Sequence, residues 1–469
     1  MMNLKLFLSF VFLIAAGGFG SLYSQNDNYW SLEECIEHAW QHNLRLQQQK
    51  LSVSLANQTL LQSRANVFPD LNAGAAHSYS IGRMIDPIIN EFVTETVQSN
   101  NFNIAAGVSI FNGFQLRNLI RQNSYELDAQ KHDLEKSFND VALTVASAYL
   151  QILFSKELLE SAGHQLDITR QQVARTAKLV EAGTLAMGSL LTIQAQQATE
   201  ELRVVNAQNQ LDLAVLELRQ LMYLPPDVDF SIEVPDVAIA PEETMEYTPL
   251  AVFNTALEIQ PEIKSAESRI LGAERGLAAA KGSRSPSLSL RGTIGTGYSD
   301  ARLETIGDPI VVTDPITGLP TVEFETRTKP FSDQIRDNLN QNIGLYLSIP
   351  IFNNFQSRVN ISRSRINLEN AQLQDRIIRD QLFKTIQQSH ADAQAALKRY
   401  HASEKNVDAL QEAFRYTEQR FGVGMINSLE YNDAKNRLTI AKSERLQAKY
   451  EFIFRSKILD FYMGNPLKF

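Results

Sequence analysis

The sequence predicts an α+β membrane protein in which one helix–strand–strand–helix unit occurs twice. Three observations predict this fold class: a short motif that recurs at constant spacing, two long stretches without proline, and four segments of alternating apolar and polar residues. These features follow the same order in both halves of the chain. Internal duplication of this kind is typical of an architecture built from repeated units.

The repeat is anchored by a short aromatic–asparagine motif. The segment IFNGFQ at 110–115 returns as IFNNFQ at 351–356, and each is followed, 72 positions after its first phenylalanine, by Gly183 or Gly424. Pro69 and Pro286, which precede the motif in each repeat, lie 217 positions apart, whereas Pro225 and Pro466, which follow it, lie 241 apart. The difference locates an insertion of 24 residues within 286–352. We interpret the insertion, which is rich in aspartate, proline and glycine, as a lengthened loop.

The N-terminal segment has the composition of a secretory signal. Lys5 precedes an apolar run from Leu6 to Ala16 and then small residues, so we expect a signal peptide over 1–24. The run is shorter than the roughly 20 residues that cross a bilayer, and no later apolar stretch is expected to reach the length of a transmembrane helix. The mature chain is therefore expected beyond the inner membrane of a bacterium.

Charge and residue content exclude several classes of function. The net charge of -9 offers no basic patch for nucleic acid. The only cysteine, Cys35, shares a helix face with His38 and His42 and could in principle hold zinc, but two exposed histidines near the chain start predict no metal site. Because no nucleophile triad, phosphate loop or His-Glu metal motif occurs, we expect neither an enzyme nor a cofactor.

Two helices of unusual length are predicted. All 15 prolines lie outside 88–224 and 351–465. Because proline costs about 3 kcal/mol and glycine about 1 kcal/mol inside a helix, their near-absence predicts continuous helices over 113–182 and 353–421. At 1.5 Å per residue each helix would reach roughly 100 Å. Apolar residues at heptad-like spacing predict lengthwise packing of the first helix, namely Leu127, Leu134, Phe138, Val141, Val145, Ala148 and Ile152.

Each long helix is followed by a glycine-containing turn and a second helical run. Such glycines supply the backbone conformation that ends a helix and reverses the chain. We therefore expect two antiparallel helical hairpins, with tips at 183–188 and 422–427 and return helices at 189–224 and 428–463.

The alternating segments predict two β-hairpins, at 69–112 and 286–352. From Phe102 to Ile110 every second residue is apolar, and each segment has about ten residues, the length of a tilted membrane strand. Sheets with one wet face also occur in soluble proteins, but two hairpins joined to long helices leave no globular core to cover. Four strands cannot close a barrel, and open edges are not tolerated in lipid. Three copies would supply twelve strands.

These motifs at matched spacing resemble those of the TolC-type outer membrane efflux proteins (outer membrane factors) over essentially the whole mature length. The resemblance rests on the duplicated order, the aromatic–asparagine motifs, Pro261-Glu262 and the tip glycines. It implies a homotrimer with a twelve-stranded outer-membrane β-barrel continuous with a long periplasmic α-helical barrel. The chain would then comprise a first repeat at 25–224, an equatorial linker at 225–249 and a second repeat at 250–469.

The resemblance also implies site residues. It implies a pore constriction at the periplasmic mouth formed by Glu430, Asp433 and Phe421, where a trimer would gather six carboxylates. The alternative reading of the acidic pair is that Glu430 belongs to a helix cap after Asn427 and Asp433 is solvated. The tips that would dock an adaptor are Gly183, Thr184, Gly424 and Met425, and the strand–helix junctions are Phe111, Asn112, Gly113, Phe352, Asn353 and Asn354.

In places the chain departs from the pattern it resembles. Ile426 stands where an arginine is expected and Phe421 where a tyrosine is expected, so we expect gating contacts of a different kind. The resemblance implies the exit duct of a tripartite efflux or type I secretion system, with a periplasmic adaptor, an inner-membrane transporter that selects the cargo, and outer-membrane lipid as partners. The alternative hypothesis is a soluble periplasmic coiled-coil adaptor or interaction protein.

Overall fold

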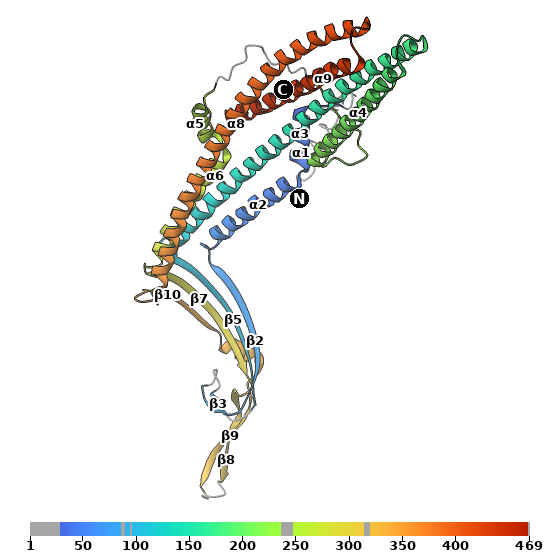
Figure 1. Ribbon diagram of the computed structural model, residues 1–469. Coiled ribbons are helices and arrows are strands. Elements are labelled where there is room, and N and C mark those ends of the chain that lie inside the picture. The colour runs from blue at the N-terminus through green and yellow to red at the C-terminus, as the bar shows by residue number, and fades with distance from the viewer. Residues whose placement is uncertain (1–28, 86–89, 94–95, 236–246, 314–318, 468–469) are drawn as a thin grey trace, which may run out of the picture.

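The computed structural model describes residues 29–85, 90–93, 96–235, 247–313 and 319–467. Figure 1 shows an elongated molecule with two long helical hairpins at one end and a twisted sheet at the other. The expected signal peptide at 1–24 lies outside the described residues, as does part of the expected linker at 225–249.

The two halves of the chain fold into matching sets of elements. The first half contains α1 (Leu32–His42), α2 (Leu44–Ala65), β2 (Asp70–Ile81), β5 (Thr96–Phe111), α3 (Gln115–Glu181) and α4 (Met187–Met222). The second contains α5 (Pro249–Ile259), α6 (Pro261–Gly282), β7 (Ser287–Ser299), β10 (Asn340–Ser348), α8 (Gln356–Gly422) and α9 (Ser428–Tyr462). Helix lengths are 11, 22, 67 and 36 residues in one half and 11, 22, 67 and 35 in the other.

In each repeat a local break in the backbone separates the 11-residue helix, α1 or α5, from the 22-residue helix that follows it. The side chain of Asn43 accepts hydrogen bonds from the backbone N–H groups of Arg45 and Leu46 at 2.9 and 3.3 Å, which caps the start of α2. In the second repeat Pro261 occupies the first position of α6, where its missing N–H costs no hydrogen bond. Different residues thus produce the same kink in both halves.

Two of the apolar clusters among the described residues join the short helices to the long ones. One joins α1, α3 and α4 around the buried side chains of Tyr149, Leu153 and Leu218. The other joins α5, α6, α8 and α9 around Val252 and Ile386. These clusters hold the short helices against the long ones.

One stretch of α3 is long and apolar enough to cross a membrane by length and composition alone. The expectation that no stretch after the signal segment would meet these criteria was therefore wrong. Half of its most apolar window is buried inside the molecule, and Val145, Leu150 and Leu153 of this stretch belong to the first apolar cluster. Packing within the fold accounts for the apolar character of this segment.

The main sheet has four antiparallel strands in the order β10-β7-β5-β2. Two short pairs accompany it: β1 (Tyr29–Trp30) lies parallel to β6 (Ser231–Ile232), and β3 (Met84–Ile85) lies antiparallel to β4 (Phe92–Val93). The hydroxyl of Tyr149 donates to the backbone oxygen of Glu233 at 2.6 Å, which fastens the β1–β6 pair to α3.

The inserted segment between β7 and β10 carries more structure than a lengthened loop. It contains the hairpin of β8 (Leu303–Thr313) and β9 (Pro320–Thr328) and the short helix α7 (Phe331–Asp337). The hairpin projects beyond the main sheet at the end far from the helices (Figure 1). The aspartate, proline and glycine content favours a loop, but β-branched residues such as Val311 and Val322, which pair across the two strands, favour a hairpin.

Candidate functional site

The main sheet separates its side chains into an apolar and a polar face. Ile104 of β5 pairs with Ala73 of β2 and Ile294 of β7, and Leu345 of β10 pairs with Leu290 of β7. Because side chains alternate along each strand, the register places these apolar residues on one face. The opposite face carries Asn72, Asn103, Thr293 and Asn342.

The apolar face and the sheet edges are uncovered in the single chain. Ile104, Ile294 and Leu345 are 47%, 46% and 65% exposed, and among the described residues no further strand pairs with the outer edges of β2 and β10. A solvent-facing sheet of this kind would leave an apolar surface and two rows of unpaired backbone groups in water. An apolar face of this kind suits an apolar medium, and the open edges are free to pair with further strands.

The junction motifs have the same geometry in both repeats. The rings of Phe111 and Phe114 meet edge to face with centroids 5.4 Å apart, and those of Phe352 and Phe355 do so at 5.6 Å. The residue before each second phenylalanine, Gly113 or Asn354, has a positive φ angle, as does the phenylalanine that follows it. Two successive left-handed residues turn the chain from the strand into the long helix.

The asparagines of these motifs bind the start of each helix. The Oδ1 atom of Asn353 accepts from the Ser357 backbone N–H at 3.4 Å, and its Nδ2 donates to the Ser357 hydroxyl at 2.6 Å. In the first repeat Asn112 Oδ1 accepts from the Leu116 N–H at 3.5 Å. Both asparagines therefore partner N–H groups that the first helical turn leaves unpaired.

The two hairpin tips end in the same backbone motif. Gly183 and Gly424 have φ angles of 72° and 76°. The N–H of Thr184 donates to the oxygen of Leu179 at 2.9 Å, and Met425 donates to Arg420 at the same distance. This is the Schellman arrangement, which requires a residue that adopts positive φ without strain. Met425 is 73% exposed, so the second tip presents an apolar side chain to solvent.

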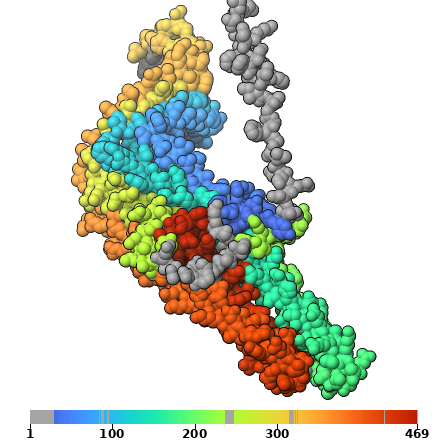
Figure 2. All heavy atoms as spheres, turned by 90° about the horizontal axis from the view of Figure 1, so that it is seen from above, coloured from blue at the N-terminus to red at the C-terminus, as the bar shows by residue number. Residues whose placement is uncertain are grey.

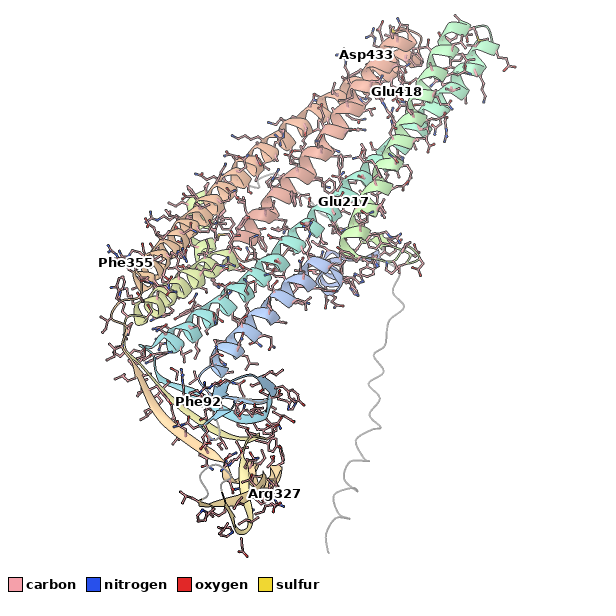
Figure 3. The ribbon with its side chains drawn as sticks, turned by 90° about the horizontal axis from the view of Figure 1, so that it is seen from below. Phe92, Glu217, Arg327, Phe355, Glu418 and Asp433 are labelled. Carbon is pink, nitrogen blue, oxygen red and sulfur yellow. The ribbon has the colours of Figure 1, made fainter. Side chains whose placement is uncertain are left out.

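Both tips lie side by side at one end of the molecule (Figure 2). A cavity of about 270 Å³ separates them, lined by residues of both hairpins that include Arg175, Leu179, Glu418, Phe421 and Ile426. Glu418 lies between the two hairpins in Figure 3. Ile426, which occupies the position where an arginine was expected, thus contributes an apolar wall to the space between the tips.

The residues expected at the constriction occupy different environments. Asp433 lies near the tip, far along the hairpin from Phe355 at the sheet junction (Figure 3), and its Oδ2 pairs with Arg437 Nε at 2.9 Å. The Glu430 side chain is exposed, and its backbone N–H donates to the capping Asn427 side chain at 2.9 Å. Phe421 stacks on Tyr431 with centroids 4.7 Å apart. One chain therefore packs Phe421 of α8 against Tyr431 of α9, while the two carboxylates are exposed.

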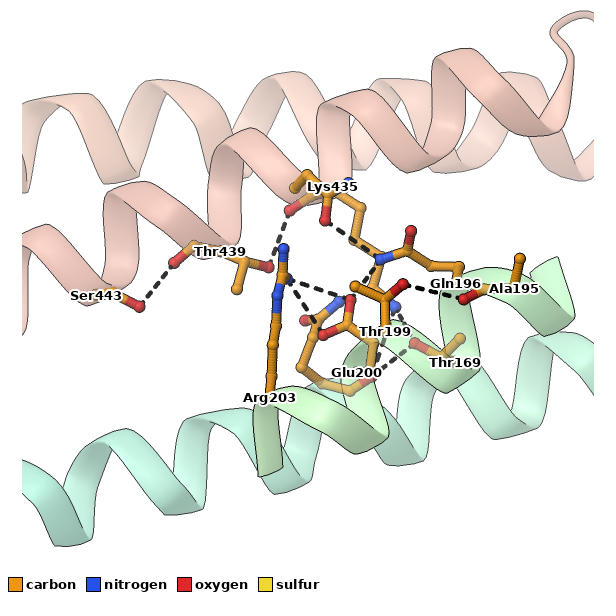
Figure 4. Close-up of polar contacts among 11 residues, drawn as sticks. Thr169, Ala195, Gln196, Thr199, Glu200, Arg203, Lys435, Thr439 and Ser443 are labelled. Atoms are coloured by element: carbon orange, nitrogen blue, oxygen red, sulfur yellow. Dashed lines mark hydrogen bonds and ion pairs between the residues drawn. The ribbon is translucent and has the colours of Figure 1, made fainter. Parts of the chain in front are cut away.

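A buried polar cluster that the sequence analysis missed joins the two hairpins (Figure 4). The ammonium group of Lys435 on α9 donates to the hydroxyl of Thr169 and lies 3.5 Å from the backbone oxygen of Gln165, both on α3. Gln196 of α4 donates to the side chain of Asn436 on α9 at 3.2 Å. The second hairpin is thus hydrogen-bonded to both helices of the first.

Two ionisable side chains of this cluster are almost completely buried. Lys435 is 2% exposed and Glu200 of α4 is 1% exposed. Glu200 pairs with Arg203 at 3.2 Å and accepts from Gln196 Nε2 at 2.6 Å. Burial lowers the pKa of Lys435 to about 8, against the opposing influence of the Glu200 charge. Separating the hairpins would return this lysine to water.

A second contact between the hairpins lies one helical turn closer to the tips. Gln172 of α3 donates from Nε2 to the hydroxyl of the buried Tyr431 on α9. Tyr431, Lys435 and Leu438 are buried at spacings of four and three along α9. A lysine within such an apolar stripe is the sequence signal that could have identified this cluster.

The histidine and cysteine side chains of α1 are arranged for packing. Cys35 is buried, which raises the pKa of its thiol to about 12. The rings of His38 and His42 stack with centroids 4.1 Å apart, and His38 Nδ1 lies 3.1 Å from the backbone oxygen of Met222. Among the described residues, no group of three or more His, Cys, Asp or Glu side chains is placed to hold a metal ion.

Paired long helices continuous with an amphipathic sheet define the class of outer-membrane channel-tunnels. The chain belongs to the outer membrane efflux protein family, whose sequence model matches residues 35–222 and 252–465, one match in each repeat. It is an outer-membrane efflux channel with a large periplasmic portion and not an enzyme. The resemblance inferred from the motifs is thereby confirmed.

Individual relatives share the whole architecture at low sequence identity. The chain is 23% identical to outer membrane protein TolC of Escherichia coli over 98% of its own length and 87% of TolC. It is 19% identical to the outer membrane efflux protein BepC of Brucella suis over 92% and 84% of the two chains. The crystal structure of CusC superposes with a TM-score of 0.75 at 18% identity, covering 95% of this chain and 96% of CusC. VceC of Vibrio cholerae gives 0.73 at 17%, covering 93% and 96%.

Proposed function

We propose that three copies of this chain form the exit duct of a tripartite efflux or type I secretion system. Three four-stranded sheets would join, β2 of one copy beside β10 of the next, into a twelve-stranded barrel. The six helical hairpins would form a periplasmic tunnel roughly 100 Å long, as expected from about 67 residues at 1.5 Å each. Substrates would pass from an inner-membrane transporter through the tunnel to the outside.

The open, one-sided sheet carries this proposal. Its apolar face is exposed, and its polar face, with Asn72, Asn103 and Thr293, suits a water-filled lumen. Lipid cannot satisfy the unpaired edge groups of β2 and β10, so closure by other copies is the arrangement that leaves no edge. Family membership favours this channel over the soluble periplasmic adaptor or interaction protein.

The assembly can be tested on the purified chain. We expect heat-resistant trimers in the outer-membrane fraction, a threefold mass by native mass spectrometry, and ion conductance in planar bilayers. Recovery of the chain as a soluble monomer without conductance would contradict the proposal.

The exposed tips are the proposed docking surface for the periplasmic adaptor. Gly183 and Gly424 fix the turns, while Thr184 and Met425 follow them at the extreme end of each hairpin. Their position at the end far from the sheet is where a periplasmic partner would meet the tunnel (Figure 1).

Photo-crosslinking can test the docking surface in cells. A photoreactive residue at 184 or 425 is expected to crosslink to an adaptor protein that is identified by mass spectrometry. The same residue at Leu373, which is 50% exposed on α8 far from the tip, is the matched control. Crosslinks to the adaptor from Leu373 but not from the tips would contradict the assignment.

For the constriction we propose that Glu430, Asp433 and Phe421 surround the periplasmic mouth. The two carboxylates form an acidic ring, and Phe421 packs against Tyr431 of α9. The exposure of both carboxylates supports their facing water in the assembly. We further propose that Lys435, Thr169 and their neighbours hold the two hairpins together while the mouth is closed, in place of contacts that the expected arginine would have made.

A further inference from the structure

The short helix α7 lies on the apolar face of the main sheet. The Phe331 ring packs edge to face against Phe102 of β5, with centroids 6.4 Å apart. It also packs at a tilted angle against Tyr298 of β7, with centroids 5.4 Å apart. The hydroxyl of Thr296 donates to the backbone oxygen of Ile335 at 2.6 Å. Phe102 and Thr296 are cross-strand partners on the same face as Ile104. Thus α7 covers this face at the end of the sheet far from the helices.

A buried glutamine fixes α7 in this place. Gln334 is fully buried, and its Nε2 donates to the backbone oxygens of Ser299 and Lys329, each at 2.8 Å. Its Oε1 accepts from the Ser299 N–H at 3.0 Å. Asn338, just after the helix, donates to the oxygen of Gly297 at 2.6 Å. The side-chain amide of Gln334 therefore uses both its donor and its acceptor groups to attach α7 to the end of β7.

Beside α7 the apolar face is hollowed into a groove of about 410 Å³. The hollow arises because β2 contributes only small side chains here, while its neighbours contribute large ones. The apolar lining consists of Ala73, Ala75, Phe102, Ile104, Ile294 and Leu339. The one hydroxyl on this lining, that of Thr296, already donates to Ile335. Asn103 also borders the groove, between Phe102 and Ile104. The groove therefore offers a ligand mainly apolar contact and no charged side chain.

We propose that this groove holds a segment of an acyl chain of lipid A, the acylated anchor of the outer leaflet, with Leu339, which follows α7, as part of its lining. The proposal rests on the proposed barrel, in which the apolar face meets lipid and the end far from the helices faces outward. Hydrocarbon is the medium that is continuous with this face. A groove lets one chain contact the protein on three sides, which gains dispersion contacts that a flat surface does not offer.

The groove can be tested by filling it. The variant Ala75→Leu places a larger apolar side chain in the hollow, while Ala106→Leu adds the same atoms on the same face, on β5 outside the groove. The measurement is the number of 3-hydroxy fatty acids, which mark lipid A, retained per trimer after purification and detergent exchange. We expect wild type and Ala106→Leu to retain several-fold more than Ala75→Leu.

Two results would overturn the proposal: equal retention of 3-hydroxy fatty acids by Ala75→Leu and wild type, or retention of glycerophospholipid chains alone. Heat-resistant trimers with normal conductance from both variants show that the barrel itself is intact. Failure of the wild-type chain to give trimers would instead count against the proposed duct, so the two failures are distinguishable.

Discussion

Gly113 and Asn354 hold the same left-handed backbone conformation at equivalent points of the two repeats, with φ angles of 64° and 49°. Asparagine is among the few residues other than glycine that adopt this conformation readily, so the backbone of the motif accepts either glycine or asparagine at this position. The atoms around the position differ between the two repeats. A Cβ atom on Gly113 would lie 2.4 Å from the backbone oxygen of Gly282.

This difference predicts an asymmetry between two reciprocal substitutions. Gly113→Asn should destabilise the junction by about 1–3 kcal/mol, as overpacking typically does, because neither backbone can move without disturbing α6. Asn354→Gly should change stability by less, since the conformation is retained. Thermal loss of the helical circular dichroism signal of the trimer measures both. Equal effects of the two substitutions would show that the Gly113–Gly282 contact does not limit stability.

The helices were predictable because their signals are local. Missing prolines and glycines lie along the chain itself, and both long helices extend within two or three residues of the expected limits. The helix α7 was not predicted, because Gln334 and packing on distant strands hold it in place. The inserted hairpin was not predicted, because the aspartate, proline and glycine content of this segment favours a loop. The Lys435 cluster was not predicted either, since its partners on α3 lie about 270 positions away in sequence.

The buried Lys435 predicts a pH-dependent contact between the hairpins. Its pKa is lowered to about 8 in the packed state and would return toward its ordinary 10.5 once the hairpins separate. Below pH 8 Lys435 is protonated whether the hairpins are packed or separated, so pH does not affect the contact through this group. Between pH 8 and 10.5 Lys435 loses its proton only when the hairpins are packed, so the contact becomes more stable as pH rises. The charged groups that influence Lys435 are Glu200, Arg203 and Glu418.

Conductance in planar bilayers measures this prediction. If separation of the hairpins opens the mouth, the open fraction should fall several-fold between pH 7.5 and pH 10 in the wild type. The variant Lys435→Met, which keeps the buried volume but has no titrating group, should show little change over the same range. An identical pH profile in both proteins would assign the dependence to another group.

The proposed acidic ring predicts a site for cation block. Glu430→Gln combined with Asp433→Asn removes six charges per trimer, so block by multivalent cations applied from the periplasmic side should weaken several-fold. The control is Glu369→Gln, an exposed glutamate on α8 near the sheet. Since Asp433 also pairs with Arg437, the single variants should be measured as well. Unchanged block in the double variant would remove the ring assignment.

Neighbouring residues on β5 give the sharpest test of which face of the sheet meets lipid. Ile104 lies on the apolar face and Asn103 on the polar face, one residue apart in the same strand. An arginine on the lipid-facing side costs roughly 2–4 kcal/mol near the middle of a bilayer, so Ile104→Arg should sharply reduce heat-resistant trimer in outer-membrane fractions. Asn103→Arg should assemble, because its charge reaches the water-filled lumen, and should lower conductance. The opposite pattern of assembly would reverse the proposed orientation of the sheet.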